Sequence, residues 1–125
     1  MSQQRRKTVL VADDDPSMLK GMRRLLKQYG FETIPFETAR ALKDHDHFDQ
    51  AFCIVLDINL SDGSGIELRH QLTELGVTLP VIYITGNDSN ATRMAAMASG
   101  CLAYLTKPFT ARSLIETIEQ AAALA

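Results

Sequence analysis

The sequence has no tryptophan, only two cysteines and no long hydrophobic run. Its longest apolar runs, VLVA and AFCIVL, are far shorter than the ~20 residues that a membrane-spanning helix needs, so we expect no membrane insertion. The start, MSQQRRKTVLVADDD, has too short an apolar run before its aspartates to act as a secretory signal. We therefore expect a cytoplasmic protein.

Cysteine and positive charge are both scarce. Two cysteines are too few for a scaffold built on disulfides, and Cys53 and Cys101 lie in apolar segments, which predicts buried, reduced thiols. The 13 Lys and Arg against 15 Asp and Glu give a net charge of −2. This is the wrong sign for binding a phosphate backbone, so we expect no nucleic-acid binding by this domain alone.

What the sequence does have is the size and pattern of one α/β domain over residues 1–125, with 46% hydrophobic residues for its core. Short apolar runs alternate with amphipathic stretches, which predicts a parallel sheet covered by helices. The predicted strands are residues 8–13, 31–36, 51–57, 80–85 and 103–106. The second has polar residues and reads as an edge strand, whereas the others read as buried on both faces.

Helical spacing and capping signals define five helices between these strands. Asp15 and Pro16 suit the start of the first helix, and Ser64 with Glu67 forms a capping box at the start of the third. The predicted helices are residues 16–30, 38–48, 64–76, 89–99 and 111–124. Right-handed crossovers then favour a doubly wound, five-stranded parallel sheet of flavodoxin-like order 2-1-3-4-5.

Chemically active residues follow the predicted strands at one edge of this sheet. Asp13 and Asp14 follow the first strand, Asp57 ends the third, Thr85 ends the fourth and Lys107 follows the fifth. In such sheets the functional crevice lies beyond the carboxyl ends of the strands. Three clustered carboxylates need a positive partner, because like charges about 4 Å apart repel by about 4 kcal/mol at an effective dielectric constant of about 20.

Oxygen ligands alone suit a hard cation such as Mg²⁺. Three carboxylates, one Mg²⁺ and the ammonium of Lys107 sum to zero charge, so the pocket can admit a phosphoryl group, with the Thr85 hydroxyl as a further partner. Carboxylates serve as nucleophiles in aspartyl-phosphate formation, and Asp57 is favoured because a flexible loop with Gly63 and Gly65 follows it. This pattern indicates phosphoryl-transfer chemistry.

The motifs VLVADDDP, VLDINLSDGSG, VIYITG and YLTKPF occur here in the order and spacing of a known family. The chain resembles the receiver domain of a two-component response regulator over about residues 8–122, and its ITG and YLTKPF segments are similar to receivers joined to helix-turn-helix output domains. Ser61 departs from the proline usual in the loop after the phosphoacceptor, and Cys101 from the alanine common after the glycine. Neither change removes a chemical group.

The resemblance implies a role for each matched residue. Asp57 would be the phosphoacceptor, Lys107 would contact the phosphoryl group, and Pro108 would follow a cis peptide bond. The metal-binding residues would be Asp13, Asp14, Asp57 and the backbone carbonyl of Asn59. Thr85 would be the switch hydroxyl and Tyr104 the switch aromatic residue.

The same resemblance implies a signalling function. The phosphoryl donor would be the phosphohistidine of a sensor histidine kinase or phosphotransfer protein, with Mg²⁺ as cofactor. The domain would catalyse only its own phosphorylation and dephosphorylation, so it would not be an ordinary enzyme. Output would use the face made by the fourth helix, fifth strand and fifth helix, toward an output domain or partner protein, and phosphorylation could produce a homodimer.

Three other interpretations compete with this one. An FMN-binding flavodoxin shares the sheet order, but its phosphate loop would be the acidic DDDP here, which repels phosphate. A haloacid-dehalogenase-like phosphatase uses similar groups, but its nucleophile lies in a D-x-D motif after the first strand, and position 59 here is Asn59. The third alternative is a receiver-like module that is never phosphorylated. The complete set of site residues argues against it.

Several residues that attract notice have plainer explanations. His45 and His47 are two apart and would not face each other on a helix, so they read as a solvated helix face, and His70 reads as a surface residue. Met94 and Met97 are expected to pack the fourth helix against the core.

Overall fold

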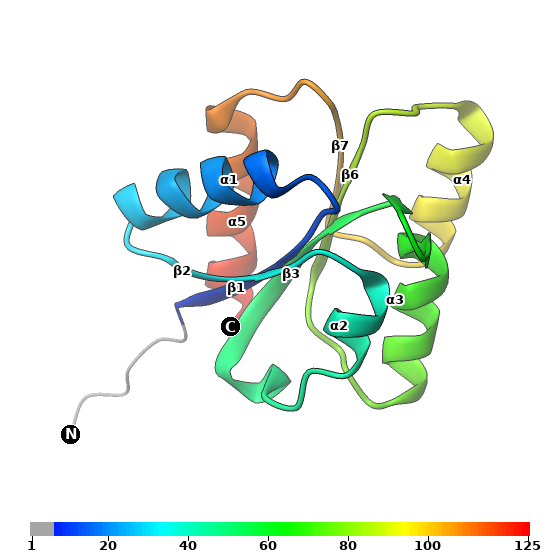
Figure 1. Ribbon diagram of the computed structural model, residues 1–125, viewed down its shortest axis with the longest axis horizontal. Coiled ribbons are helices and arrows are strands. Elements are labelled where there is room, and N and C mark those ends of the chain that lie inside the picture. The colour runs from blue at the N-terminus through cyan, green and yellow to red at the C-terminus, as the bar shows by residue number, and fades with distance from the viewer. Residues whose placement is uncertain (1–6) are drawn as a thin grey trace.

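The computed structural model describes residues 7–125, so residues 1–6 of the predicted 1–125 span lie outside the description. A central sheet of parallel strands has the order β2-β1-β3-β6-β7 (Figure 1). Its strands are β1 (Thr8–Ala12), β2 (Glu32–Phe36), β3 (Ala51–Asp57), β6 (Val81–Thr85) and β7 (Ala103–Thr106). Because β6 and β7 are its fourth and fifth strands, the predicted 2-1-3-4-5 sheet is confirmed.

Helices cover both faces of the sheet. In Figure 1, α1 and α5 lie on one side, and α2, α3 and α4 lie on the other. The helices are α1 (Pro16–Gln28), α2 (Ala39–Lys43), α3 (Gly65–Glu74), α4 (Asn90–Ala98) and α5 (Ala111–Leu124). Across residues 7–125, no helix is long and apolar enough to cross a membrane.

The sheet separates two hydrophobic clusters because successive strand residues point to opposite faces. Val9 and Val11 of β1 join the cluster beneath α1 and α5, whereas Leu10 and Ala12 join the one beneath α2, α3 and α4. Every residue of β3 is buried, as its position in the middle of the sheet requires. This double burial fixes the strand register, and with it the place where each strand ends.

Helix capping follows the predicted signals. The Asp15 carboxylate accepts a hydrogen bond of 2.9 Å from the Ser17 amide, with Pro16 at the first helical position. The Ser64 hydroxyl accepts from the amides of Ile66 and Glu67 at the start of α3. These caps place α1 and α3 directly after the sheet edge that carries the acidic residues.

The second predicted helix is shorter than expected. Instead of spanning 38–48, α2 ends at Lys43, and a turn of 3₁₀ helix follows at Phe48–Gln50. His45 lies just after the end of α2, and its half-buried ring packs against Phe36 and Phe48, with ring centroids 5.3 Å apart in both pairs. The prediction that His45 lies on a solvated helix face is therefore wrong.

The prediction that Met94 and Met97 pack into the core is also wrong. Their side chains are 72% and 53% exposed, and Ala96 is the buried residue of α4. Cys53 is buried as predicted, and burial raises its pKa to about 12. Cys101 is only partly buried, because it lies in the turn after α4 rather than in a strand.

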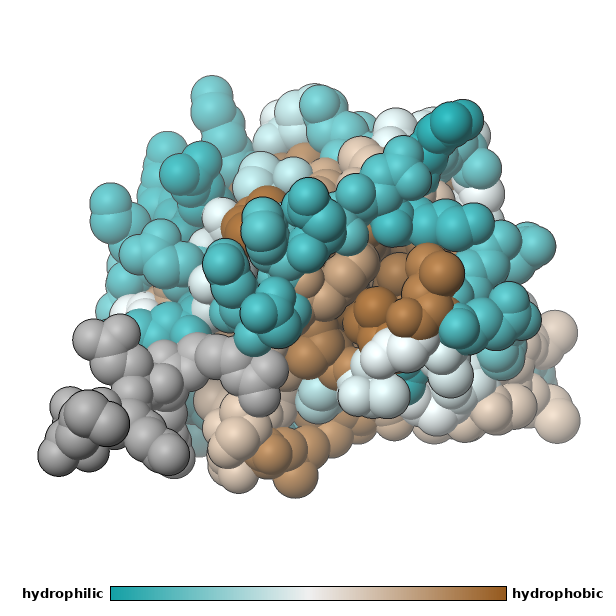
Figure 2. Space-filling view, turned by 90° about the horizontal axis from the view of Figure 1, so that it is seen from below, coloured by the Kyte–Doolittle hydropathy of each residue, from teal (hydrophilic) through white to brown (hydrophobic). Residues whose placement is uncertain are grey.

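Figure 2 shows one face of the molecule, on which hydrophilic side chains lie above and beside a central hydrophobic area. His70 is exposed, as the sequence predicts.

Candidate functional site

The carboxyl ends of the strands bring the predicted acidic residues together. Asp13 directly follows β1, and Asp57 is the last residue of β3, the neighbouring strand. One carboxylate oxygen from each of Asp13, Asp14 and Asp57 lies within 4.8 Å of the others. Asp13 and Asp57 are buried, whereas Asp14 is exposed. The result is a pocket with two fixed carboxylates in its floor and one at its rim.

Lys107 joins the two buried carboxylates. Its Nζ donates to Asp57 Oδ2 at 2.8 Å and to Asp13 Oδ2 at 3.0 Å. The lysine follows β7, and its own amide donates to the carbonyl of Thr85 at the end of β6. The peptide bond from Lys107 to Pro108 is cis. One cation therefore links residues from the first, third and last strands of the sheet.

Burial and charge pull the ionisation of this cluster in opposite directions. Burial raises the pKa of Asp57 above its usual value, although hydrogen bonds from Lys107 and the Asn59 amide favour the carboxylate. Burial lowers the pKa of Lys107, but its hydrogen bonds to Asp57 and Asp13 outweigh burial and raise the pKa overall. The lysine therefore stays charged, and its single positive charge does not neutralise all the carboxylates beside it.

The donor set fits a divalent cation. Three carboxylates and one ammonium leave two negative charges, which a +2 ion would balance. All three side chains offer oxygen ligands, which Mg²⁺ prefers. The carboxylate of Asp14, at the rim, is exposed to solvent. The acidic pocket can therefore hold such an ion.

Asn59 lies beside this pocket in a short hairpin of β4 (Asn59–Leu60) and β5 (Gly63–Ser64), which the sequence did not predict. Its amide donates to Asp57 Oδ1 at 2.8 Å. The two oxygens of Asp57 thus have different partners, because Oδ2 accepts from Lys107. This arrangement fixes the plane of the Asp57 carboxylate.

Thr85 is buried at the end of β6 and bonds across the pocket. Its hydroxyl donates to the side-chain oxygen of Asn59 at 3.0 Å and accepts from the Asn87 amide at 3.0 Å. The loop after β6 is therefore tied to the hydroxyl, and the hydroxyl to the hairpin after Asp57. An acceptor that attracts the hydroxyl proton must compete with the bond to Asn59.

Gly65 has a different role from the one its sequence context suggests. Gly65 is not part of a flexible loop; it is the buried first residue of α3, and its amide donates to the Ile58 carbonyl at 2.8 Å. A Cβ at this position would collide with the carbonyl oxygen of Asp57. The absence of a side chain thus lets α3 pack directly on the backbone of the candidate phosphoacceptor.

We expect Gly65→Ala to destabilise the fold by about 1–3 kcal/mol, because the backbone of Asp57 must shift to admit a methyl group. Gly21→Ala at an exposed position of α1 is the matched control, since a Cβ there meets nothing within 4 Å. It should stabilise the helix by up to about 1 kcal/mol. Urea unfolding of both variants checks this, and a Gly65→Ala protein as stable as wild type would contradict it.

Tyr104 lies on β7 and is partly exposed, with interactions that sequence reasoning missed. Its hydroxyl donates to Asp88 Oδ1 at 2.8 Å, and Arg93 donates to Asp88 Oδ2 at 2.9 Å. The pairing depends on β6 and β7 being neighbours, because Asp88 follows β6 and Tyr104 lies 16 residues later. No local motif in the sequence signals it.

Asp62 is a second residue that the sequence did not single out. From the turn between β4 and β5 it accepts hydrogen bonds from the amides of Ala39 at 2.8 Å and Arg40 at 3.1 Å. Those bonds lower its pKa below the usual value for aspartate. The loop after Asp57, which has Ser61 in place of proline, is thereby fastened to α2.

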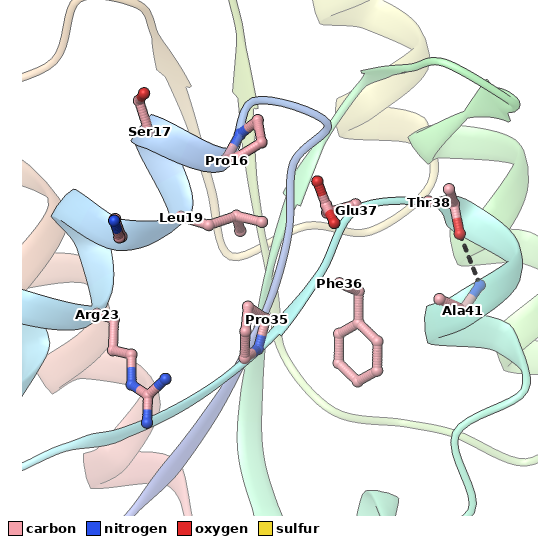
Figure 3. Close-up of a pocket in the computed structure, with 10 residues that line it drawn as sticks. Pro16, Ser17, Leu19, Arg23, Pro35, Phe36, Glu37, Thr38 and Ala41 are labelled. Atoms are coloured by element: carbon pink, nitrogen blue, oxygen red, sulfur yellow. Dashed lines mark hydrogen bonds between the residues drawn. The ribbon is translucent and has the colours of Figure 1, made fainter.

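A hollow of the surface lies between α1 and the segment joining β2 to α2. Figure 3 shows Leu19, Pro35 and Phe36 around it, with the charged side chains of Arg23 and Glu37 nearby. No residue of the acidic pocket lines it. The acidic cluster at the strand ends and this hollow are therefore separate features of the surface.

Comparison with known proteins agrees with this arrangement. The sequence matches the "Response regulator receiver domain" family over residues 9–119. It is 32% identical over 110 residues to Nodulation protein W of Bradyrhizobium diazoefficiens, covering 88% of this chain and 48% of the relative. The chain spans about half the length of the first curated relatives it matches.

Two solved structures share the fold closely. Response regulator StyR superposes with a TM-score of 0.86 and 38% identity, covering 94% of this chain and 59% of that chain. The beryllofluoride-activated NtrC4 receiver domain dimer superposes with a TM-score of 0.85 and 30% identity, covering 94% and 97%. With the family match spanning nearly the whole sheet, the chain belongs to the response regulator receiver domains, the signalling domains of two-component systems.

Proposed function

We propose that this domain accepts a phosphoryl group on Asp57 in a Mg²⁺-dependent reaction and later loses it by hydrolysis. The donor is the phosphohistidine of a sensor histidine kinase or phosphotransfer protein. The observation that carries the proposal is the Asp57 carboxylate, which is fixed by the Asn59 amide on one oxygen and by Lys107 on the other. Such positioning and charge supply most of the catalysis in phosphoryl transfer.

In the proposed step a carboxylate oxygen of Asp57 forms a bond to phosphorus as the bond from phosphorus to the donor imidazole breaks. The donor ring carries a proton on its other nitrogen, so it keeps the electron pair of the broken bond and leaves as neutral imidazole. Lys107, already within 3.0 Å of both buried carboxylates, donates to an equatorial phosphoryl oxygen. Hydrolysis of the acyl phosphate then restores the carboxylate.

The metal would be held by Asp13, Asp14, Asp57 and the backbone carbonyl of Asn59. Mg²⁺ would supply positive charge that offsets the carboxylates and the incoming phosphoryl group. The closeness of the three carboxylates supports this assignment, as does the excess of negative charge that Lys107 leaves.

Phosphorylation would act as a switch on a protein-interaction surface. Thr85 and Tyr104 would transmit the change to the face formed by α4, β7 and α5, which would contact an output domain or partner protein. A homodimer formed on activation is part of the proposal, supported by the activated NtrC4 receiver dimer. With a histidine kinase as its phosphoryl donor, the domain would work in the cytoplasm.

The domain would catalyse only its own phosphorylation and dephosphorylation and would not turn over an external metabolite. Membership of the receiver family argues against the flavodoxin and phosphatase alternatives. The remaining alternative, a receiver-like module that is never phosphorylated, predicts that no phosphoryl group is added in any phosphorylation assay. The folded unit would be a single receiver domain with its core at about residues 8–122.

We expect Asp14→Ala to weaken Mg²⁺ binding more than Asp13→Ala. Asp14 is exposed at the rim, whereas the Asp13 carboxylate is buried and already bonded to Lys107 and the Asp15 amide. Titration of Mg²⁺ by isothermal calorimetry or by NMR shifts measures both affinities. A weaker affinity for Asp13→Ala than for Asp14→Ala would reverse the assignment.

A further inference from the structure

Tyr104 is held at the surface by a cluster that the chemistry of Asp57 does not require. Its hydroxyl donates to Asp88 Oδ1 at 2.8 Å. Arg93 on α4 donates to Asp88 Oδ2 at 2.9 Å and lies over the Tyr104 ring, 4.9 Å from its centroid. The aromatic side chain is thus fixed at its hydroxyl by Asp88 and at its face by Arg93.

The electrostatics of the cluster are those of a charged acceptor with two donors. Hydrogen bonds from Tyr104 and Arg93 lower the pKa of Asp88. Partial burial and the hydrogen bond to Asp88 raise the pKa of Tyr104, so the phenol stays a donor. The side chains of Arg93 and Asp88 are 50% and 40% exposed, so the cluster is a surface latch and not part of the core.

Backbone connections join this latch to the hydroxyl of Thr85. The Asn87 amide donates to Thr85 Oγ1 at 3.0 Å, and Asp88 is the next residue along the chain. A movement of the Thr85 hydroxyl toward a phosphoryl oxygen would therefore shift the Asn87 amide that is bonded to it, and with it the backbone that carries Asp88. The sequence of contacts runs from Thr85 through the loop to Asp88 and then to the hydroxyl of Tyr104.

We propose that Asp88 is a positioning residue that holds Tyr104 in the unphosphorylated arrangement and releases it when the loop after Thr85 moves. The inference rests on the proposed function, because it assigns an off state to the aromatic switch. Its new content is a specific acidic latch, completed by Arg93, that opposes activation.

The latch can bias the switch only through contacts present in one of the two states. Tyr104 donates its hydrogen bond to Asp88, an acceptor that is charged but partly exposed. Losing such a bond from one of two states shifts the equilibrium between them by about threefold to tenfold. Because ligand affinity falls with the fraction of molecules in the competent state, removing the latch should raise affinity for a phosphoryl mimic by the same factor.

The test is a titration of the unphosphorylated protein with beryllofluoride in the presence of Mg²⁺, followed by amide shifts of α4 and β7. Asp88→Ala should lower the beryllofluoride midpoint about threefold to tenfold. Asp44→Ala is the matched control, because it removes an exposed aspartate that pairs with Arg40 on α2, and its midpoint should equal that of wild type.

A double-variant cycle separates a latch from general weakening of the fold. With Tyr104→Phe there is no hydroxyl to hold, so Asp88→Ala should change the midpoint much less than it does in wild type. Loss of structure alone would raise the midpoint of Asp88→Ala, which is the opposite direction.

The outcomes distinguish this inference from the function on which it rests. If wild type does not bind beryllofluoride while Asp57 is intact, both are overturned. If wild type binds it and Asp88→Ala has an unchanged or raised midpoint, the latch is overturned and the phosphoacceptor site stands. Equal effects of Asp88→Ala with and without the Tyr104 hydroxyl would also overturn the latch.

Discussion

Asp57→Asn is expected to abolish the addition of a phosphoryl group from a small phosphodonor with Mg²⁺. The amide is neutral and a poor nucleophile, and it cannot offer two charged oxygens to its present partners, Lys107 and the Asn59 amide. Intact-mass measurement should show one added phosphoryl group on wild type and none on the variant. Asp44→Asn, which changes an exposed aspartate on the surface, should be modified like wild type.

The contrast between these two variants makes the result interpretable. Loss of modification in both would point to a general effect of charge, and equal modification in both would remove Asp57 as the acceptor. A thermal unfolding curve accompanies each variant, because Asp57 is buried and paired with Lys107. Removing one partner of a buried pair alters stability, and the curve shows that the variant is still folded.

Thr85→Ala is expected to be phosphorylated normally but to switch poorly. The hydroxyl now bonds Asn59 and the Asn87 amide, and in the proposed mechanism it exchanges the first for a phosphoryl oxygen that exists only after transfer. A hydrogen bond to a charged group is worth about 1.5–3 kcal/mol, which is about a tenfold to hundredfold shift in the equilibrium. Losing it should leave the phosphorylated variant mainly in the unswitched state.

The comparison requires equal phosphoryl occupancy, confirmed by mass, in wild type and Thr85→Ala. NMR amide shifts of α4 and β7 then report the switch, and Thr85→Ser is the control because it keeps the hydroxyl. We expect wild type and Thr85→Ser to show the phosphorylation-dependent shifts and Thr85→Ala to lack most of them. A full response from Thr85→Ala would contradict the coupling role of this residue.

The elements that sequence predicted well are those specified by local pattern and burial. The apolar run of residues 51–56 is typical of a strand buried in the middle of a parallel sheet, and β3 is buried throughout. The caps at Asp15 and Ser64 depend on neighbours two or three residues away, so they can be recognised from local sequence. The strand order then follows from handedness and the pattern of burial.

The elements that sequence missed depend on contacts between distant segments. α2 ends before His45, whose ring contacts aromatic residues in β2 and in the following 3₁₀ turn. The exposure of Met94 reflects where α4 is placed against the sheet, which its own spacing does not specify. Asp62 bonds to amides more than twenty residues away, and Tyr104 lies 16 residues from Asp88, so no local motif reveals these contacts.

The same distinction applies to the site. Grouping Asp13, Asp57 and Lys107 at one edge required only that parallel strands end on the same side of a sheet. The hydrogen bond from Thr85 to Asn59, in contrast, depends on the hairpin after Asp57. Sequence thus predicted which residues meet, and the structure adds how their hydrogen bonds are arranged before any phosphoryl group arrives.

The most direct test of the account is to locate the phosphoryl group on the wild-type chain. The protein is treated with a small phosphodonor and Mg²⁺, and borohydride then reduces the acyl phosphate, which turns the modified aspartate into homoserine. Peptide sequencing by mass spectrometry identifies the converted residue. The account predicts homoserine at position 57 and at no other aspartate, and conversion at Asp13, Asp14 or another position with Asp57 unchanged would contradict it.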